Sequence, residues 1–158
     1  MSKIYVDEIR PKTSGAQVKF PEKPAFNARL TASETSADYS AVKDLVCGNA
    51  IFDIGNNYNT STGKFTAPVD GVYQFHARAR TDGANPSYLY IVLYLNGSVI
   101  NESHDITNGM GTNQHTSQTT ALVQLSAGDV VNPKVRTAGD SSITVDINGT
   151  GFSGFLVG

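Results

Sequence analysis

The stretch from Asn56 to Ala77 constrains the fold of this chain more than any other. In it, a series of turn-forming residues is followed by a segment in which apolar and polar residues alternate. Turn-forming residues punctuate the approach at Gly63, Pro68 and Asp70–Gly71. The following segment places every second side chain on one face of an extended backbone, namely Tyr73, Phe75 and Ala77. The period of two predicts a strand with one face in a hydrophobic core.

Composition extends this prediction to the whole chain. The 158 residues suit one domain with a short extension, and 39% of them are hydrophobic, which is enough for a core. Only 16% are charged and 15 are glycine, a balance typical of an all-β domain with many turns. The net charge of −2 gives no basic footprint for nucleic acid. Cys47 is the single cysteine, so no intrachain disulfide forms, and its apolar neighbours predict a buried thiol.

Other segments read as further short strands of an antiparallel β-sandwich. The segment Pro24–Leu30 is the first expected strand, with Phe26 turned inward, and Ile143–Ile147 alternates as cleanly as the central segment. Asn96–Gly97 is the strongest two-residue hairpin signal. Pro133 should place its strand at a sheet edge or at a bulge. Two polar segments are expected to be exposed loops, Thr81–Ser87 and Ser103–Gln118.

Several of these motifs together resemble the C1q-like family, a relative of the tumour-necrosis-factor fold. The resemblance lies in Tyr58, Gly63–Pro68, Gly71–Phe75, Thr120–Leu125 with Gly128–Asp129, and Phe152–Val157. It covers residues 24–158 and implies an antiparallel jelly-roll sandwich that assembles as a homotrimer. Two positions depart from the family pattern, since Cys47 and Ala77 stand where the family usually has aromatic side chains. Both substitutions affect the expected packing of the core rather than the fold.

Residues 1–23 differ in character from the rest of the chain. Proline and charged residues cluster there, and the two short alternating pieces Ile4–Val6 and Val18–Phe20 could be strands only if another chain completed their sheet. We interpret this segment as an extended arm that docks on a partner; a disordered tail is the alternative. The sequence of Lys3–Gly15 resembles the N-terminal segments of tail and fibre proteins of marine bacteriophages. Neither a collagen repeat nor heptads precede the predicted head.

The sequence also bears on the compartment. No apolar run of signal-peptide length begins the chain, and no segment reaches transmembrane length. We therefore expect synthesis in a host cytoplasm, a final location in a virion and no insertion into a membrane.

Enzymatic chemistry is not predicted. The chain has three histidines, His76, His104 and His115, but no nucleophile elbow, phosphate loop or nucleotide fingerprint. The spacing of His104 and His115 matches no set of metal ligands. No cofactor is expected, with calcium as the one alternative, because some C1q-like heads carry it. The calcium candidates are Asp105, Asn108, Asp140 and Asp146; the competing interpretation is that these residues serve turns.

Two groups of residues are candidates for binding partners. The predicted loop 103–118 offers polar groups suited to a glycan, and its candidate ligand residues are His104, Asp105, Asn108, Asn113 and His115. The apolar run Tyr88–Leu95 does not alternate with polar residues, so a second surface should cover its outer face. The family resemblance implies that this surface belongs to sister subunits, with the interface formed by Tyr88, Tyr90, Val92 and Tyr94.

Four functions are compatible with the sequence. The first is a bacteriophage virion protein whose trimeric head, on a tail fibre or tail tip, binds a host surface glycan or protein, while the arm binds other virion proteins. The second is a decoration or connector protein of the virion without a receptor. The third is a recognition module of a cellular organism. The fourth, a glycan depolymerase, would need paired carboxylates that the sequence does not show in a readable arrangement.

Overall fold

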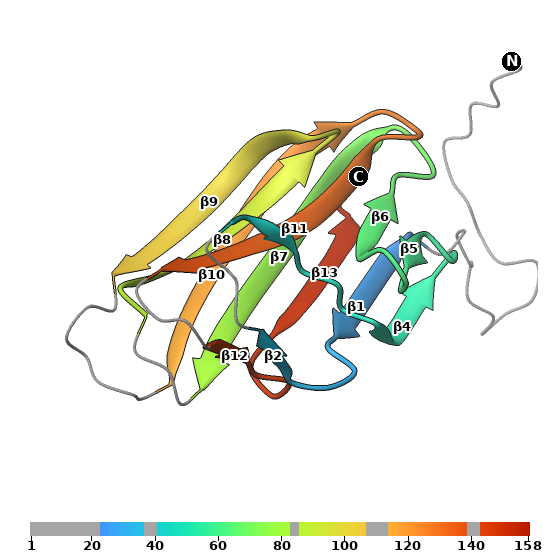
Figure 1. The fold of residues 1–158 in the computed structure, drawn as a ribbon. Helices are drawn as coiled ribbons and strands as arrows, with labels where there is room; N and C mark the ends of the chain where they lie inside the picture. Colours follow the sequence, from blue (N-terminus) through green and yellow to red (C-terminus); the bar gives the residue numbers. More distant parts are fainter. Residues whose placement is uncertain (1–22, 37–40, 83–85, 107–113, 139–142) are drawn as a thin grey trace, which may run out of the picture.

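All regular elements in the described part of the chain are β-strands. The computed structural model describes residues 23–36, 41–82, 86–106, 114–138 and 143–158, which form two antiparallel sheets packed face to face (Figure 1). The all-β jelly-roll sandwich expected from the sequence is confirmed. No helix within these residues is long and apolar enough to cross a membrane. The predicted arm, residues 1–23, lies outside the described residues except for Lys23.

The first sheet has seven strands and is built around β7 (Gly71–Asp82), the strand predicted from the alternating segment. One edge of β7 pairs with β10 along its whole length, and the other pairs with β13 and β12. Beyond β13 follow β1 and β4, and beyond β12 lies β2. The other strands of this sheet are β10 (His115–Leu125), β13 (Gly151–Leu156), β12 (Ile143–Val145), β1 (Ala25–Arg29), β4 (Asn49–Ile54) and β2 (Glu34–Ser36).

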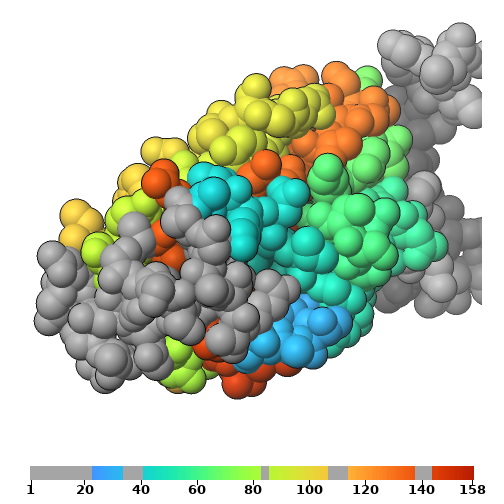
Figure 2. Space-filling model, in the orientation of Figure 1, coloured from blue at the N-terminus to red at the C-terminus, as the bar shows by residue number. Residues whose placement is uncertain are grey.

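The second sheet has six strands and is centred on β8 (Tyr88–Leu95) and β11 (Val130–Ala138). β8 also pairs with β9 (Ser98–Ile106), and Asn96 and Gly97 form the predicted hairpin turn with φ angles of 50° and 85°. The other edge of β11 holds shorter strands, namely β6 (Lys64–Thr66), followed outward by β5 (Tyr58–Asn59), and β3 (Lys43–Asp44). Figure 2 shows this side of the molecule, with the yellow atoms of β9 along the upper edge.

The core between the sheets is aromatic at one end. Six rings contact one another there, with centroids 4.7 to 6.5 Å apart: Phe26, Tyr58, Phe65, Tyr73, Phe75 and Phe152. The alternate positions of β7, Tyr73 to Ala79, are all 0% exposed, which confirms the face predicted for this strand. Cys47 is buried as expected, and its carbonyl accepts a hydrogen bond of 2.9 Å from the Tyr58 hydroxyl.

The expectation for Pro133 is wrong, because its strand β11 lies inside the six-stranded sheet. β11 pairs with β8 on one side, while on the other side its pairing with β6 ends at Val131 and its pairing with β3 begins at Lys134. The carbonyl of Pro133 accepts from Leu45 N at 3.0 Å on this second side, so the missing N–H points toward the gap between β6 and β3. A proline is tolerated in a central strand here because the neighbouring strand is interrupted at its level.

Candidate functional site

The outer face of β8 carries the four residues predicted to form a trimer interface. Tyr88, Tyr90, Val92 and Tyr94 do project from one side of this strand, opposite Leu89, Ile91 and Leu93, which are 0% exposed in the core. Within a single chain, however, Val92 is 0% and Tyr90 only 9% exposed. Neighbouring strands of the same chain therefore already cover Tyr90 and Val92, whereas Tyr88 and Tyr94 stay partly exposed, and the assignment of the trimer interface to this face stays a prediction.

Side chains from β9 cover one flank of this tyrosine face. The Tyr90 hydroxyl donates a hydrogen bond of 2.5 Å to Glu102 Oε2, and the His104 ring lies 4.3 Å from the Tyr90 ring and 5.5 Å from the Tyr88 ring. Burial and the bond to Glu102 raise the pKa of Tyr90 to about 12, because both disfavour the phenolate. The imidazole and the carboxylate thus close the surface that the sequence pattern left uncovered.

Cationic side chains from β11 cover the other flank. Lys134 Nζ lies 4.6 Å above the Tyr94 ring, and Arg136 Cζ lies 5.8 Å from the Tyr88 ring. Lys134 also lies 3.4 Å from a carboxylate oxygen of Asp44 on β3. Because long cationic side chains shield rings with their methylene stems and keep their charge in water, no partner chain is needed to explain an aromatic stripe here.

The structure does not bring the predicted ligand residues together. The polar residues of 103–118 predict a loop, but at its two ends Ser103–Ile106 continue the edge strand β9 and His115–Gln118 begin β10. His104 lies on the outer tyrosine face, whereas Asp105, opposite the buried Leu89, projects from the other side of β9. His115 is 6% exposed and faces the inside of the sandwich. Asn108 and Asn113 lie outside the described residues.

Asp146, one of the calcium candidates, has an ion-pair partner within the chain. This carboxylate, in a residue 5% exposed, is ion-paired with the guanidinium of Arg80 and also accepts from the Asn148 backbone N–H at 3.3 Å. The Arg80 guanidinium thus supplies the counter-charge of this carboxylate. Within the described ranges, no three His, Cys, Asp or Glu side chains form a group able to hold a metal ion. Asn108 and Asp140 lie outside the described residues, and Asp105 is a lone candidate.

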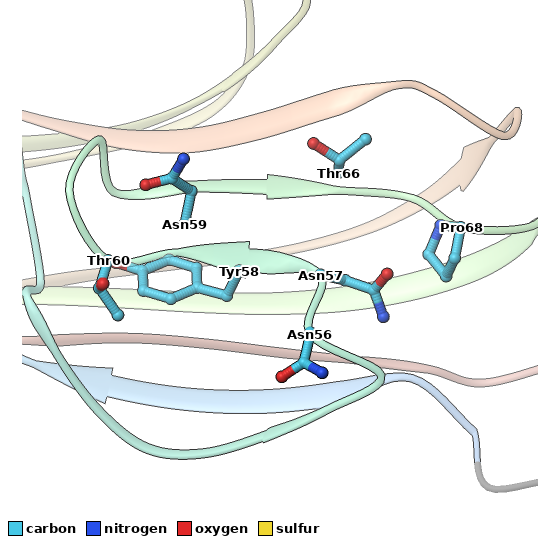
Figure 3. Close-up of a pocket in the computed structure, with 7 residues that line it drawn as sticks. All are labelled: Asn56, Asn57, Tyr58, Asn59, Thr60, Thr66 and Pro68. Carbon is cyan, nitrogen blue, oxygen red and sulfur yellow. The ribbon is translucent and has the colours of Figure 1, made fainter.

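A polar cleft of about 520 Å³ opens at the end of the sandwich where β4 turns into β5 (Figure 3). Gly55 and Asn56 make this turn with φ angles of 96° and 56°. The carboxylate of Asp53 holds the loop by accepting the backbone N–H groups of Asn57 at 3.1 Å and Tyr58 at 3.0 Å. The lining residues are Asn56, Asn57, Tyr58, Asn59, Thr60, Thr66 and Pro68.

The chemistry of this cleft is neutral. Three side-chain amides, two threonine hydroxyls and Tyr58 line it, without a carboxylate, an imidazole or an ammonium group. Figure 3 shows Asn57 and Pro68 facing each other across the opening, with Thr66 on the strand behind. Burial raises the pKa of the Tyr58 hydroxyl above its usual range, so that group also stays neutral. The arrangement suits hydrogen bonding to an uncharged ligand rather than acid–base catalysis.

The outer face of the seven-stranded sheet carries exposed apolar side chains that the sequence analysis did not select. Leu122 on β10 is 68% and Phe155 on β13 is 45% exposed, and both lie opposite Gln74 of β7 in the strand register. Phe52 on β4 is 46% exposed and adds to this face one pair of residues further along the strands. The signal was present in β10, where Leu122 is the single large apolar residue among the outward-facing Thr116, Gln118, Thr120 and Gln124.

Comparison with solved structures supports the fold independently. The globular domain of zebrafish complement 1qA superposes with a TM-score of 0.65 and 21% sequence identity, over 87% of this chain and 98% of that one. Murine APRIL superposes with a TM-score of 0.66 and 9% identity, over 86% and 100% of the two chains. Eiger TNF of S. frugiperda gives a TM-score of 0.60 at 10% identity, over 86% and 92% of the two chains. These identities are low, so the likeness establishes the fold alone.

Comparison of sequences goes further. A complement C1q subcomponent of Rattus norvegicus is 34% identical over 137 residues, which is 81% of this chain and 49% of the relative. The chain thus spans about half the length of this curated relative. The sequence model of the C1q domain matches residues 25–157, nearly the whole described part of the chain. The chain therefore belongs to the C1q domain family.

Proposed function

We propose that this chain is the head of a non-enzymatic recognition protein and that the polar cleft of Asn56–Thr60 binds a neutral saccharide. C1q domains are often trimeric recognition modules, which makes binding the expected activity. The observation that carries the ligand class is the lining of the cleft by amides and hydroxyls with no charged side chain. Amide groups donate and accept at once, as sugar hydroxyls do, so the two kinds of group are complementary.

The loop that forms the cleft is held in place before any ligand arrives. Asp53 accepts two backbone N–H groups, and Asn59 Oδ1 accepts the N–H groups of Ser61 at 2.9 Å and Thr62 at 3.2 Å. No described residue bonds the side chain of Asn56, which remains available to a ligand. Since little chain entropy is lost on binding to a preorganised loop, a modest number of hydrogen bonds is enough for recognition.

A glycan array with the purified protein tests this proposal. Asn56→Gly removes the amide and keeps the positive φ without strain, so binding should fall at least tenfold while the fold is unchanged. Asn96→Gly is the matched control, since Asn96 also has a positive φ but lies in the hairpin outside the cleft. Retention of full glycan binding by Asn56→Gly, or a ligand set consisting of charged glycans only, would contradict the assignment.

The same proposal includes assembly. C1q and TNF-like domains typically form homotrimers, and the exposed Leu122, Phe155 and Phe52 give the outer face of the seven-stranded sheet the apolar surface that a stable interface needs. Interfaces of obligate oligomers bury on the order of 2,000 Å² or more. We therefore assign the contact between chains to this sheet rather than to the tyrosine face of β8.

Light scattering of two matched variants tests the assignment. Leu122→Asp places a charge on the proposed contact and should reduce the mass from three chains toward one. Ile106→Asp alters an aliphatic residue that is 76% exposed on the opposite sheet, and the trimer should persist. A parent protein that is monomeric at micromolar concentration, or a Leu122→Asp variant that still measures three chains, would overturn the assignment.

For the biological setting we propose a bacteriophage virion, with residues 1–23 docking the head on other virion proteins and the cleft meeting a host surface glycan. The resemblance of the sequence Lys3–Gly15 to bacteriophage tail and fibre proteins supports this setting. A cellular recognition module is the second candidate, favoured by the relationship to the rat C1q subcomponent. A chain starting at Pro24 should fold and trimerise but be missing from purified particles. Its normal incorporation, or flanking genes unrelated to virions, would favour the cellular candidate.

A further inference from the structure

A second hollow, of about 190 Å³, lies on the outer face of the seven-stranded sheet, on strands β7, β13 and β1. In the register, Gly151 of β13 lies between Arg78 of β7 and Arg29 of β1. Gly151 has no side chain, so it leaves a gap between two long cationic ones. The two arginine backbones are about 10 Å apart across the three strands, a span that both guanidinium groups can bridge toward a shared ion.

The next row along the strands adds neutral and weakly basic donors. Ser153 of β13 lies between His76 of β7 and Asn27 of β1, and all three line the hollow. The hydroxyl, the amide and an imidazole N–H can each donate a hydrogen bond. His76 Nε2 lies 3.4 Å from Gln118 Oε1, an acceptor, so the other ring nitrogen can donate to an anion only when the imidazole carries both protons.

The part of the chain that the structure describes supplies no counter-charge to this hollow. Its lining contains no carboxylate, and the structure pairs neither Arg29 nor Arg78 with an acidic side chain among the described residues. Arg80, one pair further along β7, shows the contrast, because it is matched by Asp146. Two arginines on either side of a glycine, with no carboxylate in the lining, form an arrangement suited to an oxyanion, since a guanidinium bonds phosphate and sulfate oxygens in pairs.

We propose that this hollow binds a tetrahedral oxyanion, phosphate or sulfate, held by Arg29 and Arg78 across Gly151. Residues of one chain form the whole site, so the proposal does not depend on the saccharide cleft or on trimer formation. The hollow shares its face with the exposed Leu122 and Phe155. If that face is covered by sister chains, a bound anion offsets the cost of removing the arginine charges from water.

Calorimetric titration with sodium phosphate and sodium sulfate, against sodium chloride at equal ionic strength, tests the proposal. We expect saturable binding of phosphate or sulfate and none of chloride beyond ionic-strength effects. Arg78→Gln and Arg29→Gln should each weaken binding at least tenfold. The matched control Arg136→Gln, an exposed arginine of the opposite sheet, should bind like the parent. Chloride acting as well as phosphate, or unaltered binding by both hollow variants, would overturn the proposal.

Two further measurements keep the result interpretable. Gly151→Ala keeps every charge but occupies the floor of the hollow, with its Cβ 3.0 Å from the Ala28 carbonyl oxygen, and should also weaken binding. A sulfated polysaccharide tested beside inorganic sulfate distinguishes the source of the anion. Binding of the inorganic ion alone supports a small ion enclosed between sister chains. Binding of both supports a polymer-borne group and an open face, and so counts against the trimer assignment to this sheet but not against the oxyanion site. The mass of each sample, measured by light scattering, shows separately whether the trimer assignment holds.

Discussion

Gly154 of β13 is the position where one added carbon tests the packing of this core most directly. In the register it lies between Phe26 of β1 and Phe75 of β7, and the two rings close over it with centroids 6.5 Å apart. A Cβ at this position would lie 2.7 Å from Phe75 Cε1 and 2.9 Å from Phe26 Cε1. Carbon atoms in contact prefer about 3.5 to 4.0 Å, so in Gly154→Ala both rings must move by roughly 1 Å.

Neither ring has room for that movement. The Phe26 ring stacks on Tyr58 at 4.7 Å and on Phe65 at 5.1 Å, and Phe75 meets Phe65 edge-on at 5.4 Å. Overpacking of a well-filled core typically costs about 1 to 3 kcal/mol, and we expect a value in the upper half. For a domain of this size that corresponds to a fall in Tm of roughly 4 to 12 °C.

Guanidinium denaturation followed by circular dichroism, at one fixed protein concentration, measures the effect. The matched control is Gly71→Ala at the start of β7, where the added Cβ meets the side-chain end of Leu156, Cδ1, at 2.5 Å and the carbonyl oxygen of the terminal Gly158 at 3.2 Å. That side chain can rotate away, so the control should change stability by no more than about 0.5 kcal/mol. A Gly154→Ala variant as stable as Gly71→Ala would refute the claim that the ring cluster is rigid around Gly154.

Three other predictions concern polar groups. The Tyr90 pKa of about 12 exceeds the usual value near 10. The neutral Tyr90 side chain therefore contributes fully to stability below about pH 10, and this contribution is lost as pH rises through 12. Tyr90→Phe should remove this pH-dependent loss from alkaline unfolding curves. Asp146→Ala leaves Arg80 without its counter-charge and should cost about 1 to 3 kcal/mol in denaturation. The bond from Asn96 lowers the pKa of Asp129, so stability should fall as pH drops through this lowered pKa, and Asp129→Asn should flatten that acid limb of a thermal titration.

The sequence predicted best those elements whose environment is decided locally. Alternation alone identified the core face of β7, and Asn96–Gly97 identified its hairpin, because side-chain period and turn chemistry depend on adjacent residues. The edge strand β9 was missed at its end because both of its faces meet water or a partly polar surface, so Ser103–Ile106 show no apolar period. Pro133 was misplaced because its tolerance depends on where two other strands end and begin.

The candidate sites depended still more on topology. The sequence pattern alone predicts a partner chain on the tyrosine face. The side chains that flank Val92 there, Glu102 and Lys134, come from two other strands, and no local pattern reveals that register. In the same way, Arg29, Arg78 and Gly151 are far apart in the sequence and become neighbours only when β1, β7 and β13 pair.

The two outer faces of the sandwich therefore differ in how far side chains of the same chain cover them. On the six-stranded sheet, charged side chains of the same chain already cover the tyrosines, and Lys134 and Arg136 each lie against a ring. On the seven-stranded sheet, Leu122 and Phe155 stay exposed beside arginines that no described carboxylate matches. Exposed apolar side chains and arginines without a described counter-charge on one face both indicate that this face binds a partner. The proposed sister subunits would cover the apolar row and the proposed oxyanion would match the charge, which would leave the cleft at the end of the sandwich open to the proposed saccharide.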